Sequence, residues 1–139
     1  MFKKILKSKR GEMYVEGVVT FIIIIALLVF SMSVLKVSPV KSRIDLIADR
    51  LLETATHYGC FGTEFAEEVA YLQEAYPNME FTVSYDGEWY NATLQRVQLG
   101  DKMTVTVSCE VTLGALGSFV TIPLTSVRSG ASENYWKNT

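Results

Sequence analysis

The hydrophobic pattern divides the chain into three stretches with different periods. Residues 17–35 are an apolar run without a charged side chain. Within residues 40–55 the apolar side chains recur every three or four positions, which predicts an amphipathic helix. After Pro77 the period changes to two, which predicts β-strands. The chain therefore begins as helix and ends as sheet.

The apolar run has the length of a membrane span. Its 19 residues would form a helix of about 28 Å, close to the thickness of a bilayer core. Two other interpretations are a buried helix of a soluble protein and a cleaved secretory signal, for which Ser31-Met32-Ser33 offers a small-x-small site. We expect the membrane helix to cover residues 12–38 and to end or kink at Pro39, which lacks a backbone donor.

Two further helices are expected after the membrane span. The first begins near Ser38 and has one apolar stripe, which a sheet could bury. The second would be capped by Thr63 and stopped by Pro77-Asn78. The stripe of the first helix holds Val40, Ile44, Ile47, Ala48, Leu51, Leu52 and Ala55; that of the second holds Phe65, Val69, Leu72 and Tyr76.

An antiparallel meander of about four strands is expected in the remainder. Residues 81–85 alternate, and Asp86-Gly87 is a hairpin signal that would return residues 89–95 as their partner. Residues 103–113 alternate most clearly, and residues 119–127 follow, with Pro123 favouring an edge strand. The predicted fold class is α+β, with the helices on one face of the sheet.

Charge is distributed unevenly along the chain. Of the 13 basic residues, five lie in residues 1–11, whereas all 15 acidic residues lie in the rest with the other 8 basic ones. The basic start favours a cytoplasmic N-terminus. We therefore expect a leader at 1–11, the membrane helix at 12–38 and an extracytoplasmic domain at 39–139. The acidity of that domain argues against nucleic acid as a partner.

The junction between leader and apolar run carries a motif. The leader ends Lys9-Arg10-Gly11, and Glu12 and Glu16 precede the run. This resembles the processing site of type IV prepilins and their TadE-like relatives. In those families a membrane-embedded peptidase cuts after the glycine, and a glutamate stands fifth in the mature chain. The resemblance implies cleavage between Gly11 and Glu12. Glu12 as first residue departs from the phenylalanine of major pilins and is closer to the TadE-like branch.

Glu16 would then lie at the membrane edge of an apolar helix. A carboxylate in hydrocarbon is costly unless it is paired or neutralised. In a stack of parallel helices it could pair with the free amine of a neighbouring subunit and set the axial register. The alternative is an interfacial residue whose carboxylate reaches the headgroups.

The chain as a whole is similar to short TadE-like proteins of Gram-positive bacteria, in which an Arg-Gly-Glu leader and a Tyr-Trp-Lys tail are familiar, often near conjugation genes. The resemblance implies a subunit of a surface appendage or of a conjugation or secretion apparatus. Its partners would be membrane lipid, a prepilin peptidase and other pilin-like subunits. An uncleaved single-pass component of a transfer complex and a secreted binding module are the alternatives. Tyr135 and Trp136 could clasp the sheet or dock a partner.

No enzyme signature is present in the sequence. There is no phosphate loop, dinucleotide fingerprint or metal-ligand spacing, so we expect neither catalysis nor a cofactor. The single histidine, His57, lies at a helix end without a nucleophile pattern near it. Cys60 and Cys109 could form a disulfide outside the cytoplasm or remain two buried thiols; we expect the bridge.

Overall fold

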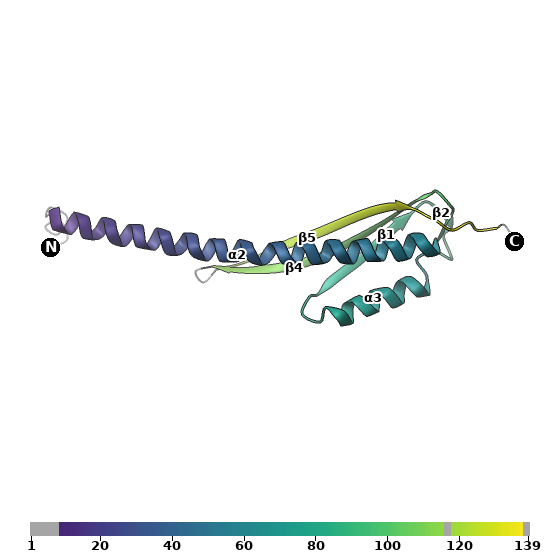
Figure 1. The fold of residues 1–139 in the computed structure, drawn as a ribbon, viewed down its shortest axis with the longest axis horizontal. Coiled ribbons are helices and arrows are strands. Elements are labelled where there is room, and N and C mark those ends of the chain that lie inside the picture. Colours follow the sequence, from purple (N-terminus) through teal and green to yellow (C-terminus); the bar gives the residue numbers. More distant parts are fainter. Residues whose placement is uncertain (1–8, 116–117, 138–139) are drawn as a thin grey trace.

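One very long helix organises the molecule. The structure, a computed structural model, describes residues 9–115 and 118–137. The helix α2 runs without interruption over Lys9–Tyr58, and a shorter helix, α3, covers Thr63–Ala75. The first half of α2 projects beyond the rest of the protein, and its second half lies along a sheet (Figure 1). Gly59, with φ +66°, ends α2 by donating its N–H to the Ala55 carbonyl.

The helix does not end at Pro39, because α2 passes through it. Proline removes one helical hydrogen bond, which leaves the Leu35 carbonyl without its usual donor. Leu35 and Pro39 are both exposed, on the side of α2 away from the sheet. The Leu35 carbonyl is therefore open to other donors, while the packed side of α2 holds the helix continuous.

The sheet has three antiparallel strands in the order β1-β4-β5. These are β1 (Phe81–Gly87), β4 (Lys102–Ala115) and β5 (Ser118–Ala131). The long alternating strand β4 and the edge position of Pro123 in β5 are confirmed. The hairpin expected at Asp86-Gly87 is wrong, since β1 pairs with β4, from Phe81↔Cys109 to Gly87↔Met103.

The segment after β1 forms a separate small hairpin. Its strands β2 (Trp89–Asn91) and β3 (Arg96–Val97) pair with each other rather than with β1. The Asn91 side chain accepts a hydrogen bond from the Leu94 N–H, which supports the turn between them. The expected four-strand meander is thus a three-stranded sheet with a two-stranded hairpin beside it, and the α+β class holds.

The core lies between the sheet and both helices. The predicted stripe of α2 is buried along its centre and faces alternate residues of β4. In α3, Phe65 and Leu72 are buried, and Phe65 contacts Tyr85 of β1 edge-on. Both helices therefore cover the same face of the sheet. The fully buried core side chains include Ile44, Ile47, Leu51, Val97, Met103, Val105 and Val107.

Candidate functional site

The projecting half of α2 is the largest exposed apolar surface in the described chain. Residues 12–25 are all exposed, and Phe21 and Ile22 are 63% and 59% accessible. Within the described residues α2 is the one helix long and apolar enough to span a membrane, and only 6% of its most apolar stretch is buried. A core helix of a soluble protein would be mostly buried, and soluble monomers rarely expose apolar patches this large.

The hydroxyl groups of this segment are satisfied inside the helix. Thr20 Oγ1 donates to the Glu16 carbonyl at 2.8 Å, and Ser31 Oγ to the Leu27 carbonyl at 2.8 Å. Ser33 Oγ donates to the Val29 carbonyl at 3.0 Å. These side chains therefore add little polarity to the surface of the apolar run.

The predicted processing residues lie at the start of α2. Gly11 and Glu12 both lie in the first turn of α2. The basic residues Lys3, Lys4 and Lys7 lie outside the described residues.

Glu12 and Glu16 are four residues apart, so they share one face of α2. Glu16 is exposed, and its carboxylate has no ion-pair partner among the described residues. Beside it is a shallow hollow, because Gly17 has no side chain and nothing lies within 4 Å of where a Cβ would be. The hollow is lined by Met13, Glu16, Gly17, Thr20, Phe21 and Ile24. A charged group and a gap in the apolar surface therefore occur at the same level of the helix.

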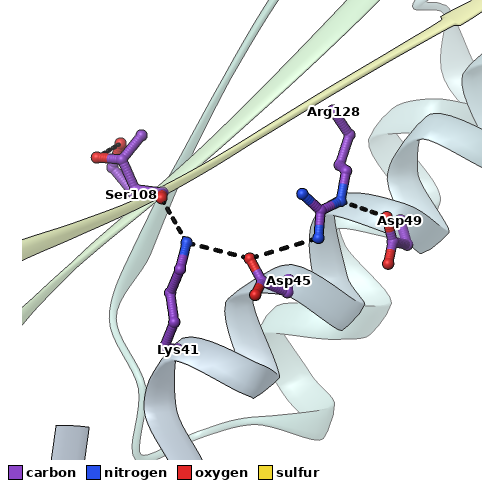
Figure 2. Close-up of polar contacts among 6 residues, drawn as sticks. Lys41, Asp45, Asp49, Ser108 and Arg128 are labelled. Carbon is purple, nitrogen blue, oxygen red and sulfur yellow. Dashed lines mark hydrogen bonds and ion pairs between the residues drawn. The ribbon is translucent and has the colours of Figure 1, made fainter. Parts of the chain in front are cut away.

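An ionic network joins the part of α2 that packs on the sheet to β5 (Figure 2). Lys41 Nζ lies 3.1 Å from Asp45 Oδ1 and donates a 2.7 Å hydrogen bond to the Thr125 carbonyl. Arg128 Nε donates a 2.6 Å hydrogen bond to Asp49 Oδ1, and its Nη2 lies 3.7 Å from Asp45 Oδ1. The network fixes the register of β5 along α2.

The pKa of the Asp45 carboxyl is lowered from its ordinary value of 3.8. The Ser126 hydroxyl is the main cause, with Lys41 and Arg128 adding to it, and partial burial acts in the opposite direction. Asp45 Oδ1 and Ser126 Oγ are buried and lack a hydrogen bond of good geometry. The Ser126 hydroxyl therefore acts on the carboxylate without a hydrogen bond of ordinary geometry.

The predicted disulfide between Cys60 and Cys109 is wrong, since both cysteines are free thiols. Cys109 pairs with Phe81 at one end of β1. The neighbour of Cys60, Phe61, lies at the other end, 3.8 Å from the Cβ position of Gly87. Six residues of strand separate the two ends by about 20 Å. A disulfide needs Cα atoms within about 7 Å.

Burial also raises the pKa of the Cys109 thiol, with Glu110 and Glu80 adding to the effect.

Trp136 in the tail packs against the end of α2 and the small hairpin, whereas Tyr135 is 64% exposed. The Trp136 indole N–H is shared between the carbonyls of Gly59 and Val97, at 3.2 and 3.1 Å. The Arg96 guanidinium lies 4.2 Å from the indole ring centroid. The clasp expected of the tail therefore involves Trp136 and a helix end rather than the three-stranded sheet.

Sequence reasoning missed the role of Arg128. The i, i+4 spacing of Lys41, Asp45 and Asp49 was visible in the sequence as a charged helix face. Nothing in the sequence paired that face with an arginine 79 residues away from Asp49. Across residues 9–115 and 118–137, no group of three or more His, Cys, Asp or Glu side chains could hold a metal ion.

These features define a class: an α+β protein built on a long helix that carries an apolar run with the length and composition of a membrane span. Residues 20–137 match the model of a family described as a domain of unknown function, DUF4320, and the chain belongs to that family. No curated protein and no solved structure matches the chain. The family match covers the described fold from within the apolar run to the Trp136 clasp.

Proposed function

We propose that this protein is a prepilin-like, TadE-like membrane subunit of a surface appendage or of a conjugation or secretion apparatus. A peptidase removes the basic leader after Gly11, and α2 anchors the mature chain with its α+β domain outside the cytoplasm. Assembly then proceeds by packing of the projecting helices of several subunits. The resemblance of residues 9–16 to prepilin processing sites and the shape of the molecule support the proposal.

The observation that carries the proposal is the division of α2 into two halves with different surroundings. Residues 12–25 are exposed and apolar apart from Thr20 and the two glutamates, whereas the second half has one face buried against the sheet. Because the helix is continuous, the domain and the projecting segment form one rod. A long N-terminal helix packed on a sheet is the shape of a pilin-like subunit, with lipid or neighbouring helices around the bare half.

Glu16 supplies the register in this account. Cleavage after Gly11 leaves a free amine on Glu12, and a neighbouring subunit shifted along the stack can bring that amine to Glu16. The Coulomb attraction between two such charges about 4 Å apart is about 4 kcal/mol at the effective dielectric near a protein surface, before the cost of removing both groups from water is subtracted. A lone carboxylate in the bilayer is costly, so pairing favours transfer of the subunit from lipid into the assembly.

A single-pass component that is never cleaved is the second candidate. It shares the anchored helix and the domain, and it differs in keeping residues 1–11. A secreted binding module is less well supported. Cleavage after Ser33 would remove Ala26 and Val29, which are partly covered in the folded protein, and Ser33 itself is 9% accessible. The fold thus uses part of the segment that such cleavage would discard.

The proposal is tested by Glu16→Ala and Glu16→Gln in the native host, with Glu53→Gln on the outward side of the same helix as the matched control. The readout is the fraction of protein in high-mass surface complexes after crosslinking. We expect both Glu16 variants to stay in the membrane fraction as processed single subunits, with at least a tenfold loss of complexes, and the control to assemble normally. Unchanged assembly of Glu16→Ala would remove the register role.

A further inference from the structure

The far ends of β4 and β5 extend past β1 as a two-stranded ribbon. The last pair between β1 and β4 is Phe81↔Cys109, whereas β4 and β5 continue to pair as far as Ala115↔Ser118. We call the part of this extension formed by residues 110–115 and 118–123 the ribbon. It points toward the projecting half of α2 (Figure 1).

The level that the ribbon reaches on α2 follows from three contacts along β5. A Cβ on Gly130 would lie 3.2 Å from Thr56, Arg128 bonds to Asp49, and the Thr125 carbonyl accepts from Lys41. The strand β5 thus runs beside α2 in the same direction. From Thr125 back to Phe119 is six residues, or about 20 Å. That distance equals about 13 helical residues, which brings Phe119 to the level of roughly residue 28 of α2.

The burial of α2 gives the same level independently. Residues 12–25 are exposed, and the first partly covered positions are Ala26 and Val29, followed by the buried Ser33. These continue the buried stripe of the helix by steps of three and four toward its N-terminus. The covered stripe therefore begins about ten residues before the apolar run ends at Leu35.

This overlap has a consequence for the membrane. A bilayer core is about 30 Å thick and needs about 20 helical residues. The part of the run that the sheet leaves bare, residues 17–25, would span only about 14 Å. If residues 17–35 lie in the membrane, the end of the ribbon lies there with them.

The chemistry of the ribbon agrees with that position. No residue from 111 to 127 is charged, whereas Glu110 and Arg128 flank this stretch. Phe119 is 79% and Val120 58% accessible, on opposite faces of β5. A Cβ on Gly114 would lie 3.0 Å from the Phe119 ring, so the ring lies over the glycine and hides backbone.

The ladder hydrogen bonds limit how deep the ribbon can go. The pairing of β4 with β5 satisfies the groups between the two strands, but their outer edges have no partner strand in the ribbon. Open sheet edges are not tolerated in the middle of a bilayer. Pro123 removes one such donor, and the Thr112 and Thr121 side chains are exposed nearby. The ribbon is therefore suited to the interface and the outer leaflet.

We propose that the end of the ribbon, with Phe119 and Val120, inserts among the lipids of the outer leaflet beside α2. There it fixes the depth and the rotation of the helix in the membrane. This inference rests on the proposed membrane span of α2 and is independent of leader cleavage and of subunit assembly. The ligand of the ribbon is a lipid surface, which its two apolar side chains and its uncharged backbone contact.

The test places an environment-sensitive NBD label on single cysteines of the full chain in phosphatidylcholine vesicles. Cys60→Ser/Cys109→Ala is the background, and Phe119→Cys is the reporting variant. Ile24→Cys on α2 is the control for the membrane span. Val127→Cys is the matched control for water, because Val127 is exposed on the same face of β5 as Phe119.

We expect the label at position 119 to emit at shorter wavelength than the label at 127, and nitroxide on the upper acyl chain to quench it at least threefold more. One outcome overturns lipid insertion of the ribbon but leaves the membrane span intact. In that outcome the label at position 24 is quenched, and the label at 119 behaves like the label at 127. A label at 24 that is not quenched overturns the membrane span itself. Shielding of position 119 from water without quenching by nitroxide lipid means that protein covers it, which also overturns lipid insertion.

Discussion

Arg128 on β5 and Asp49 on α2 are joined by a 2.6 Å hydrogen bond between Nε and Oδ1, although 79 residues separate them in the chain. The same guanidinium lies 3.7 Å from Asp45, one turn earlier on the helix. One arginine therefore holds two successive turns of α2 against the edge strand. Since the ribbon is the continuation of that strand, its level beside the apolar run depends on this contact.

Replacing Arg128 by alanine should weaken the attachment of β5 to α2. Ion pairs at this exposure contribute at most about 1 kcal/mol each, so we expect the free energy of unfolding to fall by about 1–2 kcal/mol. Urea unfolding in detergent, followed by circular dichroism, measures the change. In a double-mutant cycle with Asp49→Ala the effects should be less than additive, and full additivity would show that the bond contributes nothing.

The stability of the domain should decrease at acid pH in part through Asp45. Its pKa is lower in the folded protein than its ordinary value of 3.8. The stabilisation is therefore fully present above about pH 4 and is lost as the pH falls through the folded value. Asp45→Asn should cost up to about 1 kcal/mol at pH 7 and nothing measurable near pH 2. A difference from wild type that persists unchanged at pH 2 would contradict the assignment, and Glu53→Gln serves as the exposed control.

Trp136→Phe should destabilise the end of α2. The substitution keeps a ring beside Arg96 but removes the indole donor shared by the Gly59 and Val97 carbonyls. A lost hydrogen bond of this kind costs about 1 kcal/mol. Thermal unfolding should shift downward by a few degrees, and hydrogen exchange at Gly59 should accelerate. Tyr135→Phe changes an exposed neighbour and should have no effect; equal shifts for both variants would contradict the clasp.

The two thiols should react independently and at different rates. Cys60 is partly exposed, whereas Cys109 is buried and its thiol pKa is raised, so less thiolate is present. With a maleimide at pH 7.5, Cys60 should be modified at least tenfold faster. Reducing agent should leave the thermal midpoint unchanged. A lower midpoint after reduction, or a mass 2 Da below that of the reduced chain, would show that the two cysteines form a disulfide.

Local sequence signals located the helices and the longest strand. The spacing of Ile44, Ile47 and Leu51 predicts a buried stripe, and the alternation of Val105 and Val107 predicts a buried strand face; the structure has both. These predictions succeed because each depends on a single period within one element. The α+β class follows from them without knowledge of how the strands pair.

Features that depend on distant partners were not predictable in the same way. Asp86-Gly87 is a good turn signal, yet β1 gains seven paired residues on β4, and the chain turns only after Glu88, whose N–H donates to the Lys102 carbonyl. At Pro39 the packing of α2 against the sheet outweighs the local break. The candidate site divides likewise: Gly11, Glu12 and Glu16 could be named from the sequence, whereas the Arg128 network and the ribbon required the fold.

The central claim is that a membrane-anchored subunit is released from its basic leader for assembly. The N-terminus of the mature protein in its native host, determined by mass spectrometry of the purified membrane fraction, tests it most directly. The account predicts a chain that begins at Glu12 and retains the whole of the apolar run. A chain that begins at Met1, or one that begins after Ser33, would contradict it.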